Sequence, residues 1–166
     1  PQQQNVVLRV NYNLTKKENA MSADLIFSLC SSAILPGWLL LVFAPKWKWT
    51  TGFITSFLIP FMLGLVYIGL FLSQADVMPQ GGGFGSPQEL AVSFSNPYLL
   101  TAGGIHYLAF DLFVGTWEVT DAKKQGINHW LVVPCLFFTL MLGPAGFALY
   151  LLLRFFITKQ FFLQDA

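Results

Sequence analysis

Four long apolar runs, separated by shorter polar connections, constrain the fold of this chain more than any other feature. They cover about residues 24–44, 50–72, 96–120 and 129–156. A helix needs about 20 residues to cross a bilayer, and each run is that long. Backbone amides in lipid must bond within their own segment, so the spans are expected to be helices. The sequence therefore predicts an all-α, polytopic membrane protein with about four transmembrane helices in a small bundle.

The charge content supports a membrane location. Only 10% of the 166 residues are charged and 55% are hydrophobic, whereas a soluble domain carries about 25% charged residues. So few charges could not cover a water-facing surface, and membrane lipids are the expected partners. The formal net charge of +1 gives no reason to expect nucleic acid as a partner.

The polar segments divide the chain into three parts. Residues 1–23 form a polar, turn-rich N-terminal arm, in which the alternation over residues 6–12 suits an interfacial strand when the arm docks on a partner. Residues 24–158 form the four-helix membrane domain, and residues 159–166 form a C-terminal tail. The glycine-rich connection from Ser73 to Ser95 is expected to be a flexible link.

The first short loop suits a membrane boundary, but it does not settle the orientation. Lysine and tryptophan alternate from Lys46 to Trp49, a pattern typical of the headgroup region. With four spans, five basic residues lie on the side of the termini and four in the odd loops. This difference does not decide which side faces the cytoplasm or its equivalent.

The third run contains the polar residues that most need a partner. His106 and Asp111 lie in an otherwise apolar segment, where an ionised carboxylate costs at least about 2.5–3.5 kcal/mol. Helical spacing places Gly104, Tyr107, Asp111, Gly115 and Glu118 on one face. Asp111 is either tied to a neighbouring helix or faces a ligand cavity, and the sequence leaves both readings open.

We take His106 and Asp111 as the candidate catalytic residues and Tyr107, Trp117 and Glu118 as the candidate ligand-binding residues. His106 precedes Asp111 by five residues, which is about 140° around a helix, so the two cannot pair on one face. With only two histidines and no paired ligand motif, no metal site is predicted.

Two further features bear on possible ligands. Glu118 and Asp121 are expected to form a solvated acidic edge beside Lys123 and Lys124. Aromatic residues make up 16% of the chain; such rings suit a bound carotenoid or chlorophyll, and they equally suit ordinary lipid contact.

The third run and its flanks resemble one known family. The sequence His106-Tyr-Leu-Ala-Phe-Asp111-Leu-Phe-Val-Gly, followed by Trp117-Glu118 and Asp121, resembles the central motif of the abscisic-acid-deficient-4-like family. Gly143-Pro144-Ala145-Gly146 with Tyr150, and Leu35-Pro36 with Ala44-Pro45, are similar to its other spans. The resemblance covers about residues 24–158.

The resemblance implies a plastid-type membrane protein needed to rearrange violaxanthin, a carotenoid epoxide, into the allenic alcohol neoxanthin. In such a step the epoxide oxygen is protonated while a base removes a proton from the polyene, and Asp111 and His106 would be the acid and base. The reaction is an isomerisation and requires no redox cofactor. One position departs from the family: Thr116 stands where members often have arginine, which removes a cationic partner for Asp111 or Glu118.

Two functions remain open at this stage. One is a carotenoid-modifying, isomerase-like enzyme or an accessory protein of that pathway. The other is a non-catalytic, pigment-binding or scaffolding subunit of a larger photosynthetic pigment-protein complex. The membrane would be photosynthetic or plastid-type, or a bacterial inner membrane. A transporter is disfavoured, because the chain shows no internal repeat.

Overall fold

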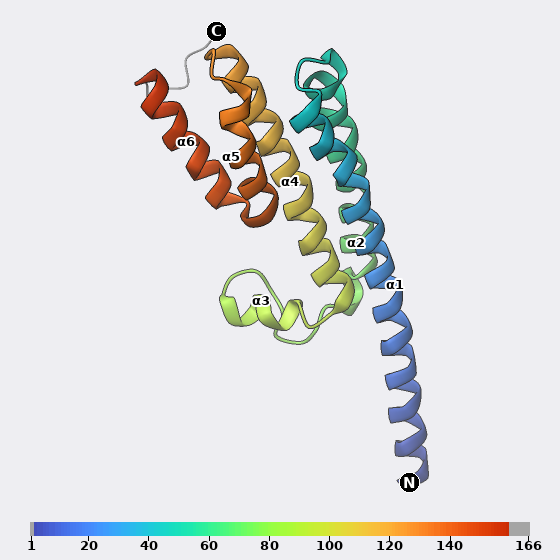
Figure 1. The fold of residues 1–166 in the computed structure, drawn as a ribbon. Helices are drawn as coiled ribbons and strands as arrows, with labels where there is room; N and C mark the ends of the chain where they lie inside the picture. Colours follow the sequence, from blue (N-terminus) through green and yellow to red (C-terminus); the bar gives the residue numbers. More distant parts are fainter. Residues whose placement is uncertain (1, 160–166) are drawn as a thin grey trace. The chain divides into compact units, whose positions relative to one another are not determined.

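The backbone of residues 2–159 and the side chains of residues 22–159 are described by the computed structural model. The described part contains six α-helices, a π-helix, a short 3-10 helix and no strand, which confirms the all-α class. In chain order the elements are α1 (Gln2–Phe43), η1 (Thr50–Leu58), α2 (Ile59–Ser73), η2 (Ala75–Val77), α3 (Pro87–Ser93), α4 (Pro97–Lys124), α5 (His129–Leu142) and α6 (Pro144–Thr158) (Figure 1).

Three helical segments are long and apolar enough to cross a membrane. They are Ser22–Phe43 within α1, Thr50–Ser73 across η1 and α2, and Pro97–Lys124, which is α4. They match the first three predicted spans to within a few residues. Large apolar side chains such as Phe43 and Leu72 remain exposed along them, as expected where lipid is the surrounding solvent. The protein is therefore membrane-embedded.

The second span begins as a π-helix of nine residues, a conformation that is rare in proteins. Pro60 follows directly in the first turn of α2. Proline has no N–H and its ring clashes with the carbonyl one turn earlier, so a widened turn accommodates it. The hydroxyl of Thr55 donates to the carbonyl of Thr50 over 2.8 Å, and the hydroxyl of Thr50 donates to the carbonyl of Ala44 over 2.8 Å. These threonines keep two carbonyl groups bonded in the distorted stretch.

The N-terminal segment differs from the sequence-based expectation. Helix α1 begins at Gln2, so the expected turn-rich backbone is wrong for residues 2–23, and the strand over residues 6–12, expected when the arm docks on a partner, stays a prediction. The physical reason is composition: residues 2–23 contain neither glycine nor proline, and the apolar span that follows extends the same helix. Its division from the membrane domain at residue 23 stays a prediction.

Two compact units divide the chain: one combines residues up to Cys30 with Leu65–Ile105, the other Ser31–Gly64 with residues from His106 onward. In the first unit, the Oδ1 of Asn96 caps α4 by accepting from the N–H of Tyr98 over 2.9 Å. Its amide also donates to the Oε1 of Gln74 over 2.8 Å. The connection expected to be a flexible link contains η2 and the capped helix α3.

In the second unit, the predicted fourth span is a hairpin of two helices. The chain reverses at Gly143, whose φ of +50° is in a region that favours glycine. Helices α5 and α6 have 14 and 15 residues, or about 21 and 22 Å, so neither alone crosses a hydrocarbon core of about 30 Å. Figure 1 shows them running antiparallel beside the C-terminal part of α4. Three spans and this hairpin approximate the predicted four.

Small residues let the helices of this unit approach closely. A Cβ on Gly146 would fall against the backbone nitrogen of Thr139, which places α6 directly on α5. A Cβ on Gly115 would lie 2.8 Å from the indole of Trp38 and 3.3 Å from Leu136. Between α1 and α5, the Nε2 of His129 lies 2.9 Å from the carbonyl oxygen of Val42. The core therefore joins α1, α4 and the hairpin within this unit.

Candidate functional site

A polar cluster lies between the C-terminal half of α4 and the hairpin. We define it by five residues, all buried: Glu118, Asp121, Thr139, Tyr150 and Arg154. Glu118 is 0% exposed, and its Oε1 accepts a hydrogen bond of 2.8 Å from the hydroxyl of Thr139 on α5. The other oxygen, Oε2, is buried and has no hydrogen-bond partner within the described part of the chain.

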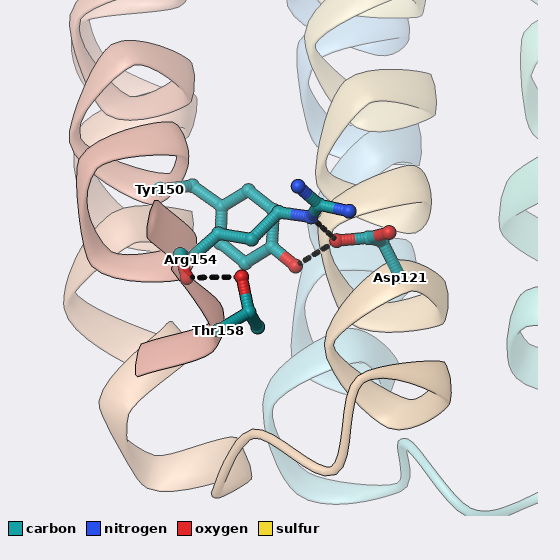
Figure 2. Close-up of polar contacts among 4 residues, drawn as sticks. All are labelled: Asp121, Tyr150, Arg154 and Thr158. Atoms are coloured by element: carbon teal, nitrogen blue, oxygen red, sulfur yellow. Dashed lines mark hydrogen bonds and ion pairs between the residues drawn. The ribbon is translucent and has the colours of Figure 1, made fainter. Parts of the chain in front are cut away.

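Asp121 is the acceptor for two side chains of α6. The phenol of Tyr150 donates to its Oδ2 over 2.6 Å, and the Nε–H of Arg154 donates to the same oxygen over 2.8 Å. Figure 2 shows both side chains converging on Asp121 from the neighbouring helix. Tyr150 and Arg154 can do so together because they are four residues apart and share one face of α6. The hydroxyl of Thr158 donates to the carbonyl of Arg154 over 2.9 Å.

This arrangement corrects one prediction from the sequence. Glu118 and Asp121 were expected to form a solvated acidic edge beside Lys123 and Lys124. The two lysines are exposed, but both carboxylates are buried. The prediction is wrong because the hairpin covers that face of α4, and its own Tyr150 and Arg154 replace water as partners.

Asp111 has a different environment from the other two carboxylates of α4. It is partly exposed, whereas Glu118 and Asp121 are buried. Its carboxylate lies at the reversal of the hairpin, where a Cβ on Gly143 would be 2.8 Å from Oδ1. Gly143 is also the N-cap of α6 and provides no side-chain cap. Asp111 therefore packs against the turn between α5 and α6.

The other sequence-predicted site residues fall into two groups. His106 and Tyr107 are exposed, and the His106 ring lies 4.6 Å from that of Phe110 between centroids. Trp117 meets Phe147 and Tyr150 edge to face, at 5.5 and 5.6 Å. The structure thus brings Trp117 and Glu118 to the hairpin with Asp111, but it leaves His106 and Tyr107 on the outside of the helix.

The described residues contain no group of three or more His, Cys, Asp or Glu side chains that could hold a metal ion. Cys30 and Cys135 are both buried and free. The chemistry that this unit offers is proton transfer at carboxyl groups, with aromatic rings close by.

The sequence comparison decides the family. Residues 25–150 match the model of the ABA DEFICIENT 4-like family. The chain belongs to this family. Membership suggests a carotenoid-related membrane protein, in agreement with the resemblance of the central motif. The searches of curated proteins and of solved structures found no match.

The ABA DEFICIENT 4-like match includes Asp111, Glu118, Asp121 and Tyr150 but ends four residues before Arg154. Arg154 and Thr139 are not among the site residues predicted from the sequence. One signal was available: Arg154 stands within an apolar run, four residues after Tyr150, and a basic residue in such a run calls for an acidic partner. Arg154 supplies a cation to this helix pair, although Thr116 replaces the arginine often found in the central motif.

Proposed function

We propose that this protein rearranges a carotenoid epoxide within the membrane, as in the conversion of violaxanthin to neoxanthin, and that Asp111 transfers the proton. One observation carries the proposal: of the three carboxylates on α4, only Asp111 is partly exposed. A ligand arriving from lipid can reach it without opening the packed hairpin. Glu118 and Asp121, in contrast, are enclosed by their partners.

A single carboxylate can complete such a rearrangement. In its ionised form, Asp111 acts as the base that removes a proton from the polyene. The electron pair forms the new double bond of the allene while the carbon–oxygen bond of the epoxide breaks. The resulting alkoxide then takes the proton from the Asp111 carboxyl. The proton lost by carbon ends on oxygen, so no oxidant or reductant is consumed.

In this proposal the polar cluster positions Asp111 rather than contacting the substrate. Glu118 and Asp121 lie about two and three turns further along α4 and hold the hairpin in place through Thr139, Tyr150 and Arg154. The hairpin in turn places the start of α6 beside Asp111. His106 is on another face, and the proposal assigns it no proton transfer.

The experiment expresses the full chain in the membrane of a bacterial host that makes violaxanthin and measures neoxanthin by chromatography. We expect Asp111→Asn to lower conversion by about a hundredfold or more, as loss of an acid–base group does, at unchanged protein abundance. Asp76→Asn, which changes an exposed carboxylate in η2, is the matched control and should convert normally. Undiminished conversion by Asp111→Asn would refute the assignment.

A second candidate function rests on a separate observation. Phe53, Phe57 and Phe61 form a ladder of exposed rings along η1 and α2, with centroids 5.7 and 5.2 Å apart and planes 28° and 9° apart. Such a row suits an apolar pigment held without chemistry. A pigment-binding subunit would co-purify with stoichiometric pigment in a larger photosynthetic complex, and Phe57→Leu would lower the pigment content while Phe113→Leu, on an exposed face of α4, would not. A small species that converts violaxanthin without retained pigment would exclude this function.

A further inference from the structure

Basic side chains gather at one end of the second unit. All five lysines whose side chains the structure describes are in this unit and are exposed: Lys46 and Lys48 between α1 and η1, Lys123 and Lys124 at the end of α4, and Lys159 after α6. We call this set of five residues the lysine end.

Two contacts bring these lysines to the same end. The Nε2 of His129, at the start of α5, lies 2.9 Å from the carbonyl oxygen of Val42, in the last turn of α1. Helix α6 runs in the same direction as α4 (Figure 1), and Arg154 near its end bonds Asp121 near the end of α4, so Lys159 follows α6 at the end of the unit where Lys124 closes α4. The three lysine-bearing segments therefore leave the unit on one side.

Within the described residues of this unit, no fully exposed acidic side chain accompanies the lysine end. The acidic residues described in this unit are Asp111, Glu118 and Asp121, all within α4; Asp111 is partly exposed and the other two are buried. The connection at the other end of α4 has the opposite sign: residues 74–96 contain Asp76 and Glu89 and neither lysine nor arginine.

Aromatic rings accompany the lysines in the manner of a headgroup boundary. Trp47 and Trp49 are 50% and 48% exposed, and Trp130 is 66% exposed. The Nζ of Lys48 lies 5.6 Å from the centroid of the Trp49 ring, and the Nζ of Lys159 lies 5.5 Å from that of Phe156. Indole rings prefer the interface, and ammonium groups there reach lipid phosphates.

The hairpin changes the count of charges that sets orientation. A fourth span would have ended on the opposite side from the two short loops, but the hairpin ends α6 on their side. Lys159 then adds to the four loop lysines, so the side of the lysine end has five basic residues. The side where the first span begins has three, Arg9, Lys16 and Lys17. The four loop lysines also lie in short loops, and it is the lysines and arginines of short loops that the positive-inside rule counts.

From these observations we propose that the lysine end faces the cytoplasm or its organelle equivalent and binds the headgroups of anionic lipids in that leaflet. The occupant is a lipid rather than a soluble anion, because the exposed tryptophans place the lysines at the membrane surface. The proposal is independent of the carotenoid reaction and concerns a different part of the molecule.

Lipid selectivity tests the first half of the proposal. The full chain is reconstituted in phosphatidylcholine vesicles that contain a small share of brominated phosphatidylglycerol or the same share of brominated phosphatidylcholine, and tryptophan quenching is measured. We expect stronger quenching by the anionic lipid. The affinity of the protein for this lipid, relative to phosphatidylcholine, should fall about fivefold for each lysine removed. Lys123→Gln with Lys124→Gln should reduce the preference, and the matched pair Lys16→Gln with Lys17→Gln should not. Equal quenching by both lipids would overturn the proposal.

Labelling tests the orientation. Gln125→Cys places a thiol in the loop after α4, and Gln80→Cys places one in the connection after α2. In intact bacterial cells, a membrane-impermeant maleimide should label the cysteine at position 80, and the cysteine at position 125 should react only after permeabilisation. The reverse pattern would overturn the proposal even if the lipid preference were observed.

Discussion

Arg154 donates its Nε–H to the Oδ2 of Asp121 over 2.8 Å, and both residues are buried. The two residues come from different helices, 33 positions apart in the chain. Their pairing holds α6 against α4 in a low-dielectric environment, where loss of one partner leaves the other charge buried and unpaired. The hairpin that carries α6 also places Gly143 beside Asp111, so this ion pair supports the candidate site.

Removal of the cation should therefore destabilise the protein strongly. We expect Arg154→Met to lower the free energy of unfolding by about 3–5 kcal/mol, because Asp121 loses its ionic partner while still buried. Denaturant unfolding in detergent, followed by tryptophan fluorescence, measures the change.

The double variant Arg154→Met with Asp121→Leu provides the control for this prediction. It removes both charges at once and should recover much of the lost stability. If the single variant unfolded at the wild-type denaturant concentration, the ion pair would have no structural role.

Tyr150 should contribute less than Arg154 to the free energy of unfolding, but by a measurable amount. Tyr150→Phe removes only the phenol that donates to Asp121 over 2.6 Å and keeps the ring contact with Trp117. We expect a loss of about 1.5–3 kcal/mol, the usual range for a hydrogen bond to a charged group. Tyr107→Phe, at a residue that is 47% exposed, should leave stability nearly unchanged. Equal effects of the two substitutions would contradict the burial of the Tyr150 bond.

The hairpin depends on the absence of a side chain at position 146. Gly146→Ala would place a methyl group against the backbone of Thr139 and should cost about 3 kcal/mol or more, because backbone cannot move aside easily. Gly64→Ala is the matched control, since a Cβ there meets nothing within 4 Å. Circular dichroism melts in detergent compare the two, and a tolerated Gly146→Ala would show that α5 and α6 do not pack as described.

His106 gives a prediction that separates the two candidate catalytic residues. It is exposed and lies on a different face of α4 from Asp111, so one epoxide cannot contact both on the same side. His106→Gln should lower violaxanthin conversion much less than the roughly hundredfold expected for loss of an acid–base group. Chromatography of the pigments from cells with matched protein abundance tests this. A loss equal to that of Asp111→Asn would restore His106 as the complementary group.

The spans were predictable because their signal is local. Twenty or more apolar residues between polar loops identify a transmembrane helix without knowledge of its neighbours. The last run, however, is long enough for one span, and the Gly143-Pro144 break does not show by itself whether the chain kinks or reverses. Reversal depends on the fit of Gly146 against Thr139, which is a tertiary contact between residues seven positions apart.

The candidate site was predictable in its residues but not in its pairing. Of the residues that helical spacing placed on one face, Gly115 and Glu118 are buried and Asp111 is partly exposed, whereas Tyr107 is 47% exposed. Helical spacing could not identify Arg154 as the partner of Asp121, since that contact exists only after the hairpin folds back. For the same reason, the burial of Glu118 and Asp121 was missed.

The most direct test of the account is violaxanthin conversion by the wild-type chain and by Asp111→Asn, at equal abundance in the same membrane. We expect neoxanthin from the wild type and about a hundredfold less, or none, from the variant. Conversion by the variant at the wild-type rate would contradict the role of Asp111, and a wild-type chain that forms no neoxanthin would contradict the proposed reaction itself.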